Sequence, residues 1–295
     1  MSPPGSSMQI GVSSYSYSRL IRSGEMTEFD AIRKTAELGY DVIEFSSLHP
    51  PGGEPFDQYA PDVRTACDET GLPIANYTVG ADFINGSGGD WQREVERVKD
   101  EVRIAHLLGA PGMRHDATRG FPDSRPGERS FDDALAVLVP AIRAVTEFAA
   151  DLGVRTMVEN HGMFCQDSER VERLVNAVNH ENFGVLIDIG NFLCVDEPPD
   201  AAVGRLIPYA FHVHAKDFHT RPGTATDPGE GWFRTRGGNY LRGAIVGHGE
   251  VPLASCLHVL SRHGYDGVLS IEFEGLEHPV DGVRIGLDNL RRYLG

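Results

Sequence analysis

Four short apolar segments, each ending in an acid or an imidazole, decide the fold: VRTMVE (154–159), FGVLID (183–188), YAFHVH (209–214) and DGVLSIE (266–272). Their last residues, spaced 29, 26 and 58 positions apart, are Glu159, Asp188, His214 and Glu272. The first two intervals each have room for one helix and one further strand. Polar side chains at the carboxyl ends of successive parallel strands are typical of the catalytic face of a (β/α)8 barrel.

The remaining sequence predicts the other strand–helix units of such a barrel. In the amino-terminal half, apolar and β-branched segments predict strands at 9–14, 41–45, 72–78 and 109–115. Apolar residues at helical spacing predict helices between the strands, and Thr27 and Gly39 mark the start and end of the first long one. We therefore expect an α/β protein, a single (β/α)8 TIM barrel over residues 8–295.

Long segments rich in Gly and Pro interrupt this alternation and predict loops. They follow the second, third, fourth and seventh strands, at 46–55, 81–90, 116–130 and 217–247. Loops in these positions belong to the C-terminal face of a barrel, where substrate specificity resides. Residues 1–7 are interpreted as a disordered leader, because they lack the basic and apolar regions of a signal peptide.

The amino-acid composition argues against a nucleic-acid binder and against a membrane-spanning protein. The net charge of −16 argues against a nucleic-acid binder, which needs a basic surface. No apolar segment approaches the roughly 18 residues of a membrane span. Four widely spaced cysteines without a CxxC pair predict reduced thiols in a cytoplasmic protein: Cys67, Cys165, Cys194 and Cys256. A small carbohydrate or polyol is the expected partner, and a homo-oligomer is compatible with the sequence.

Three carboxylates and one imidazole would form a predominantly hard ligand set if the four strand ends converge. Such a set favours one divalent ion, Mn²⁺ or Mg²⁺, with Co²⁺ or Zn²⁺ as alternatives, because no thiolate belongs to it. A single acid at a strand end is usually only a solvated or capping residue. Four of them in phase, each after an apolar segment, favour a metal site.

Five motifs are similar to those of the xylose isomerase-like TIM-barrel superfamily: VEN (158–160), LIDIGN (186–191), HVHAKD (212–217), GHGEVP (247–252) and YDGVLSIEFE (265–274). The resemblance covers the last four strands, and the amino-terminal half matches only through its βα rhythm and DVIEF (41–45). The superfamily includes sugar phosphate isomerases and epimerases, among them enzymes of the tagatose 3-epimerase, inosose isomerase and inosose dehydratase types.

The resemblance implies a metal site and a reaction. The superfamily's ligands fall on the four strand-end residues Glu159, Asp188, His214 and Glu272. In the epimerases the two glutamates also act as acid and base on opposite faces of the substrate, so both are candidate catalytic residues here. The metal ion in those enzymes binds a carbonyl and an adjacent hydroxyl, which acidifies the α-proton and stabilises an enediolate.

Two positions depart from the epimerase pattern. The epimerases carry a histidine three residues after the aspartate of the sixth strand, where this chain has Asn191. They also place an arginine six residues after the metal-binding histidine, where this chain has Thr220 with Arg221 beside it. The metal half of the pattern is intact, whereas the half that holds the substrate is altered, and Asn191 and Arg221 remain candidate substrate-binding residues.

Further candidates lie near the strand ends. His161, two residues after Glu159, is a candidate acid or base at neutral pH, and a related branch of the superfamily that eliminates aglycones from 3-keto glycosides has a similar arrangement. The candidate substrate-binding residues are Glu44, Lys216 and His115, the last beside Arg114. Tyr15 and Glu274 are interpreted as rim residues.

The leading hypothesis is a metal-dependent isomerase or epimerase of a sugar, keto-sugar or inosose. The alternative is a metal-dependent lyase on the same scaffold, either an inosose dehydratase or a 3-keto-glycoside or C-glycoside eliminase. A minor alternative is an apurinic-site endonuclease, which shares the barrel but uses more histidines and a basic face. The net charge of −16 counts against that third function.

Overall fold

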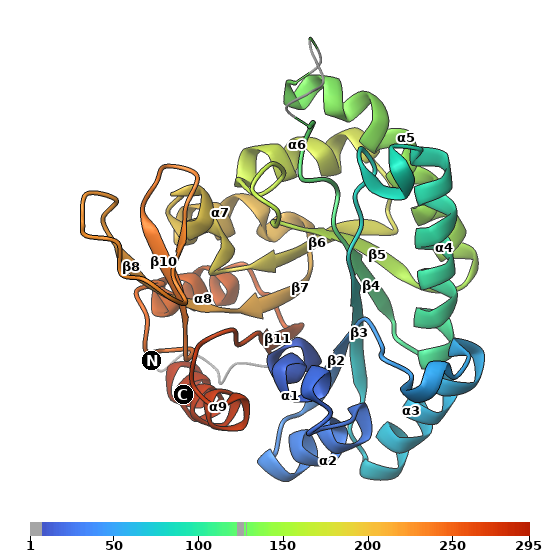
Figure 1. Ribbon diagram of the computed structural model, residues 1–295, viewed down its shortest axis with the longest axis horizontal. Coiled ribbons are helices and arrows are strands. Elements are labelled where there is room, and N and C mark those ends of the chain that lie inside the picture. Colours follow the sequence, from blue (N-terminus) through green and yellow to red (C-terminus); the bar gives the residue numbers. More distant parts are fainter. Residues whose placement is uncertain (1–7, 123–126, 128) are drawn as a thin grey trace.

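A computed structural model of the protein describes residues 8–122, 127 and 129–295. The leader expected at 1–7 and part of the loop expected at 116–130 lie outside these residues. Eight parallel strands close into a barrel in the order β1-β11-β7-β6-β5-β4-β3-β2 (Figure 1). The strands are β1 (Gln9–Ser13), β2 (Val42–Ser46), β3 (Ile74–Val79), β4 (Gly112–His115), β5 (Arg155–Glu159), β6 (Phe183–Asp188), β7 (Ala210–Ala215) and β11 (Val268–Ile271). The expected (β/α)8 barrel is confirmed.

Helices surround the barrel and separate its strands. They are α1 (Ser18–Ser23), α2 (Glu28–Leu38), α3 (Phe56–Thr70), α4 (Trp91–Leu108), α5 (Phe131–Asp151), α6 (Ser168–Val178), α7 (Pro199–Leu206), α8 (Leu253–Arg262) and α9 (Pro279–Leu294). The predicted limits of α2 are correct, because Thr27 forms a capping box with Asp30 and Gly39 ends the helix at a φ of 83°. No helix among the described residues is long and apolar enough to cross a bilayer.

Short 3-10 turns lie in several of the connections. They are η1 (Ser14–Tyr17), η2 (Pro51–Gly53), η3 (Gly86–Gly88), η4 (Asn191–Val195) and η5 (Ile207–Tyr209). The turn η1 matters most for the site, because it follows β1 at the C-terminal face of the barrel. The Ser16 hydroxyl donates to the carbonyl of Ile271 and accepts from the amide of Phe273, so this turn is fixed to the end of β11.

The long segment expected as a loop at 217–247 contains an antiparallel sheet instead. Its strands are β8 (Asp217–Arg221), β9 (Phe233–Arg234) and β10 (Tyr240–Ala244), in the order β8-β10-β9. Figure 1 shows β8 and β10 extending from the barrel on the side of α7 and α8. The strands are short and their pattern is hidden by the Gly and Pro residues of the turn between them, so the sequence suggested only a loop. We call residues 217–247 the excursion.

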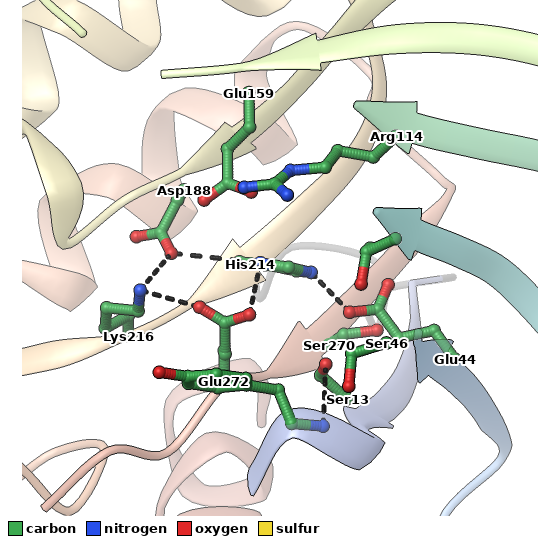
Figure 2. A network of polar contacts seen from close by, with 12 residues as sticks. Ser13, Glu44, Ser46, Arg114, Glu159, Asp188, His214, Lys216, Ser270 and Glu272 are labelled. Atoms are coloured by element: carbon green, nitrogen blue, oxygen red, sulfur yellow. Dashed lines mark hydrogen bonds and ion pairs between the residues drawn. The ribbon is translucent and has the colours of Figure 1, made fainter. Parts of the chain in front are cut away.

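The layer inside the barrel below the C-terminal face is polar. It is lined by buried Ser13, Glu44, Asn76, His212 and Ser270 (Figure 2 labels three of them). Burial of such groups is costly unless they have hydrogen-bond partners. Their concentration at one end of the barrel therefore indicates that this end has a function beyond apolar packing.

Candidate metal centre

Four neighbouring strands direct the predicted metal ligands to one point. Glu159 ends β5, Asp188 ends β6, His214 is the penultimate residue of β7, and Glu272 directly follows β11. These strands are consecutive in the barrel, and Asp188 is paired with His214 in register. Figure 2 shows the four side chains facing one another. Glu159, Asp188 and His214 are buried, so little water can compete with a ligand for their polar atoms.

The arrangement fits a divalent cation. Each of the four residues offers one ligand atom, and all four atoms lie within 4.8 Å of one another. His214 Nδ1 is buried and has no hydrogen-bond partner among the described residues; it lies 3.6 Å from Glu272 Oε1 and 3.8 Å from Asp188 Oδ2. At these distances the ring nitrogen is in ion-pair range of both carboxylates but too far from either for a hydrogen bond. A cation between them would give each of these atoms a partner.

Glu44, predicted to bind substrate, lies below this point and holds His214 from its other side. Its Oε1 is 2.5 Å from His214 Nε2, and its Oε2 is 2.8 Å from His212 Nε2. Burial opposes the charge of Glu44, but the two imidazoles keep the pKa of this carboxyl well below its usual range. A carboxylate on Nε2 orients the ring and leaves Nδ1 for a metal ion. Glu44, His212 and His214 also form a group that could hold a metal, but the carboxylate already bridges the two rings.

Two cations compensate the acidic cluster. Arg114 Nε, from β4, lies 2.5 Å from Glu159 Oε2, and Lys216 Nζ lies 3.1 Å from Asp188 Oδ2 and 2.6 Å from Glu272 Oε2. Burial raises the pKa of Asp188, but the Lys216 ammonium, His214 and the backbone amide of Asn191 together outweigh it, and the pKa falls to about 2. For Glu159 burial prevails over Arg114, and the pKa of the carboxyl is raised.

Asn191 links these groups where the epimerases have a histidine. Its amide nitrogen donates to Glu159 Oε1 at 2.8 Å, and its amide oxygen accepts from Lys216 Nζ at 3.2 Å. The predicted substrate-binding residues Asn191 and Lys216 thus lie directly beside the ligand group. Asn191 cannot exchange protons as a histidine would, and its side chain bridges Glu159 and Lys216.

His161 lies at the mouth of the site and is paired with Asp116. Its Nδ1 is 2.9 Å from Asp116 Oδ1, and Arg114 Nη2 is 3.0 Å from the same oxygen. Burial lowers the pKa of His161, but the hydrogen bond and the charge of Asp116 outweigh it and raise the pKa above its usual value. Because Nδ1 is engaged, the other ring nitrogen is the one available to a substrate. Asp116 was not recognised from the sequence, since it lies in a loop and its partner is 45 residues away.

A cavity of about 220 Å³, which we call the catalytic cavity, opens above the ligand group. Its lining residues are Tyr15, Ser46, Ser47, Thr78, Val79, Gly80, Arg114, Glu159, His161, Lys216, Glu272 and Glu274. Larger hollows of about 410 and 530 Å³ lie on the excursion, but none of the four ligand residues lines them. The smaller cavity is therefore the relevant one, because it holds the charged and titratable groups.

The structure does not bring the candidates His115 and Arg221 into this cavity. His115 follows Arg114 in β4, so it points to the opposite face of the strand and packs between Phe83 and Phe183. Burial lowers its pKa to about 4. Arg221 lies on the excursion, where its guanidinium is 5.5 Å from the centre of the Trp232 ring. The alternation of β4 gives the inward position to Arg114.

The fold has counterparts among known proteins, although the sequences differ widely. No curated protein matches the sequence closely enough to be called a relative. Solved structures with a similar fold include D-allulose 3-epimerase from Methylomonas sp. (16% identity, 99% of this chain and 100% of that chain, TM-score 0.72). The probable 3-DHS dehydratase AsbF from Bacillus anthracis is also similar (18% identity, 96% and 99%, TM-score 0.73).

A third similar structure is 3-keto-D-glucoside 4-epimerase, YcjR, from E. coli (17% identity, 97% of this chain and 99% of that chain, TM-score 0.69). Identities this low establish the shared fold alone. The match to a family is stronger, because the model described as xylose isomerase-like TIM barrel covers residues 32–293. The predicted resemblance is confirmed, and the chain belongs to the xylose isomerase-like TIM barrel family.

Proposed function

We propose that the protein is a divalent-metal-dependent isomerase or epimerase of a sugar, keto-sugar or inosose. The observation that carries the proposal is the unpaired His214 Nδ1 facing the carboxylates of Asp188 and Glu272 at the base of a small polar cavity. Buried polar atoms normally have a hydrogen-bond partner, and His214 Nδ1 has none among the described residues although two carboxylates face it. A hard divalent ion, Mn²⁺ or Mg²⁺ before Co²⁺ or Zn²⁺, suits three carboxylates and one imidazole.

Glu159, Asp188, His214 and Glu272 would hold the ion. When bound, it supplies Lewis-acid polarisation of a carbonyl, which makes the adjacent C–H more acidic. Glu159 and Glu272 come from opposite sides of the ligand group, β5 and the end of β11. One carboxylate accepts the proton from the substrate carbon, and the other returns a proton to the opposite face of the resulting enediolate in an epimerase. In an isomerase the proton returns to the neighbouring carbon, and the hydroxyl proton moves from one oxygen of the enediolate to the other.

Each of the two glutamates has a cation beside it. Arg114 and Lys216 contact Glu159 and Glu272, so each carboxylate keeps a positive partner when it becomes charged. The Lys216 ammonium also lines the catalytic cavity, and its three N–H groups are directed at Asp188, Glu272 and Asn191. Its pKa is far above the usual range, because Asp188 and Glu272 outweigh the effect of burial. Lys216 therefore acts as a fixed cation and hydrogen-bond donor.

The His161–Asp116 pair favours a second candidate function, a lyase. Asp116 engages Nδ1 of His161, which leaves the other nitrogen as a proton carrier facing the catalytic cavity. In an elimination, one base removes the proton next to the carbonyl and the β-substituent departs with its bonding electron pair. The protonated His161 would then give its proton to the departing oxygen or carbon, so that the two products are neutral.

Solvent exchange tests the reaction shared by both candidates. We expect the metal-loaded protein to incorporate deuterium from D2O next to the carbonyl of at least one member of a panel of ketoses, inososes and 3-keto glycosides. Product analysis then separates an epimer or isomer from a released aglycone or water. Glu272→Gln should abolish exchange while the far-ultraviolet circular dichroism is retained. Full exchange by this variant would refute the proposed metal site.

A further inference from the structure

A second cavity, of about 150 Å³, lies next to the catalytic cavity, and we call it the side cavity. Its lining residues are Tyr15, Ser16, Ser18, Arg19, Arg22, Phe273, Glu274 and Gly275. They come from η1 and α1, which follow β1, and from the segment after β11; these two strands are neighbours in the barrel. Tyr15 and Glu274 line both cavities. These two residues thus form the boundary between the cavities.

The boundary residues are placed for contact with a ligand. Tyr15 is 37% exposed, so part of its ring is accessible to a ligand. The Glu274 carboxylate lies 3.9 Å from Lys216 Nζ, so it is turned toward the catalytic cavity. The hydrogen bonds of Ser16 to the end of β11 hold the backbone of η1 at this position.

The side cavity offers a mixture of hydrogen-bonding groups. Arg19 is committed to the fold, because its guanidinium donates to the carbonyls of Leu276 and Glu277. Arg22 is exposed, and its guanidinium donates to the hydroxyl of Ser18 at 3.4 Å. Arg22 lines the side cavity together with the aromatic ring of Tyr15, the hydroxyl of Ser18 and the carboxylate of Glu274.

Donors, an acceptor and an exposed aromatic face in one small space suit the hydroxyl groups of a sugar ring. A purely anionic group would meet the carboxylate of Glu274, and a purely apolar group would leave the guanidinium of Arg22 without partners. Size points the same way: each cavity alone is smaller than the roughly 300–1,000 Å³ of sites for larger ligands, whereas together they exceed the lower bound.

We propose that the substrate consists of two rings. The catalytic cavity takes the sugar that is deprotonated, and the side cavity takes a second, hydroxylated sugar ring joined to it by a glycosidic bond. This inference rests on the proposed function and names its substrate class: a keto-sugar glycoside rather than a free monosaccharide. Tyr15 and Glu274 then contact the linkage between the rings, while Arg22 and Ser18 contact the second ring.

Ser18→Trp tests the proposal, because an indole at this position fills the side cavity and leaves the catalytic cavity open. Deuterium exchange is measured with Mn²⁺ on fructose and on glucosyl-fructoses linked at different carbons. We expect the wild type to prefer one glucosyl-fructose, and Ser18→Trp to lower kcat/KM for it about tenfold or more. The variant should retain the rate on fructose, which also shows that it is folded. Ser23→Trp, at the exposed end of α1 and outside the cavity lining, is the control and should keep the preference. Equal losses on both substrates would overturn the proposal.

Binding separates this proposal from the proposed function. Calorimetry of the Mn²⁺-loaded protein compares sorbitol with maltitol, a glucosyl-sorbitol that cannot react. We expect tighter binding of maltitol and loss of this preference in Ser18→Trp and Arg22→Ala. A preference for maltitol without exchange on any sugar would refute the proposed function and leave the two-ring site standing.

Two results would overturn the two-ring site. One is equal affinity for the two polyols. The other is a loss in Arg22→Ala confined to fructose 6-phosphate, because it would assign the side cavity to an anionic group.

Discussion

The two halves of the barrel contribute different chemistry to one cavity. The carboxyl-terminal half, with β5, β6, β7 and β11, supplies every candidate ligand: Glu159, Asp188, His214 and Glu272. The amino-terminal half supplies groups that compensate or orient those ligands, Glu44 from β2 and Arg114 from β4. The comparison teaches that a ligand set and its nearest cation, Lys216, can follow a local sequence pattern, whereas Glu44 and Arg114 reach the same ligands from strands far away in the sequence.

The largest expected effect lies in the carboxyl-terminal half. Asp188→Asn removes one charge from the ligand group and should lower kcat/KM about a thousandfold, because Lewis-acid stabilisation is worth several kcal/mol. Chelation of the metal from the wild type should have an equally large effect, restored by Mn²⁺. The matched control is Asp196→Asn on the surface after η4, which should retain activity. A variant of Asp188 with normal rate and metal content would contradict the division between the halves.

The next effect lies in the amino-terminal half and concerns stability. Arg114→Met leaves Glu159 buried without its cation, and we expect it to lower the free energy of unfolding by about 3–5 kcal/mol. Arg103→Met, which breaks the exposed pair with Asp100, should cost no more than about 1 kcal/mol. Urea unfolding measures both. Addition of Glu159→Gln to Arg114→Met should recover part of the loss, and absence of any recovery would argue against a direct ion pair.

A smaller effect is expected from the orienting carboxylate. Glu44→Gln weakens the hold on His214, and we expect the affinity for Mn²⁺ to fall about 10–100-fold. The control is Glu28→Gln, since Glu28 is also buried and accepts hydrogen bonds from Tyr59 and the amide of His49, away from the site. That variant should lose stability but keep its metal affinity. Equal metal affinities of the Glu44 variant and the wild type would show that the amino-terminal half does not act on the ligands.

The smallest effect is a pH dependence of metal binding. Burial lowers the pKa of His214, but the charges of Glu44 and Glu272 outweigh it and raise the pKa well above its usual value. A metal ion needs the neutral imidazole, so one proton leaves on binding, and the affinity should fall about tenfold for each pH unit below that pKa. Calorimetric titration with Mn²⁺ in two buffers of different ionisation enthalpy measures the released proton. An affinity that stays constant as the pH falls would show that His214 is already neutral in the metal-free protein.

Much of the fold was predictable because barrel strands carry local signals. Short apolar segments, caps such as Thr27 and stop signals such as Gly39 depend on neighbouring residues alone. The excursion was missed because its strands pair across a long turn and have no strong alternation of their own. The roles of the ligand residues stay predictions, although their positions agree with the expected convergence.

The opposite orientations of Arg114 and His115 are a feature that the local sequence does not determine. Both residues end the same strand and both are basic, so the sequence treats them alike. The side chains of adjacent strand residues point to opposite faces, and only the closed barrel determines which face is the interior. Asp116 is a similar case, since its partner His161 belongs to a different strand–loop unit.

By itself, the sequence determined that Glu159, Asp188, His214 and Glu272 stand at strand ends, because strand length and burial are local properties. Tertiary structure alone decided which cations neutralise them, why His214 Nδ1 has no partner, and that a second cavity adjoins the first. The physical reason is that electrostatic compensation and cavity shape depend on distances between strands, and closure of the barrel sets those distances.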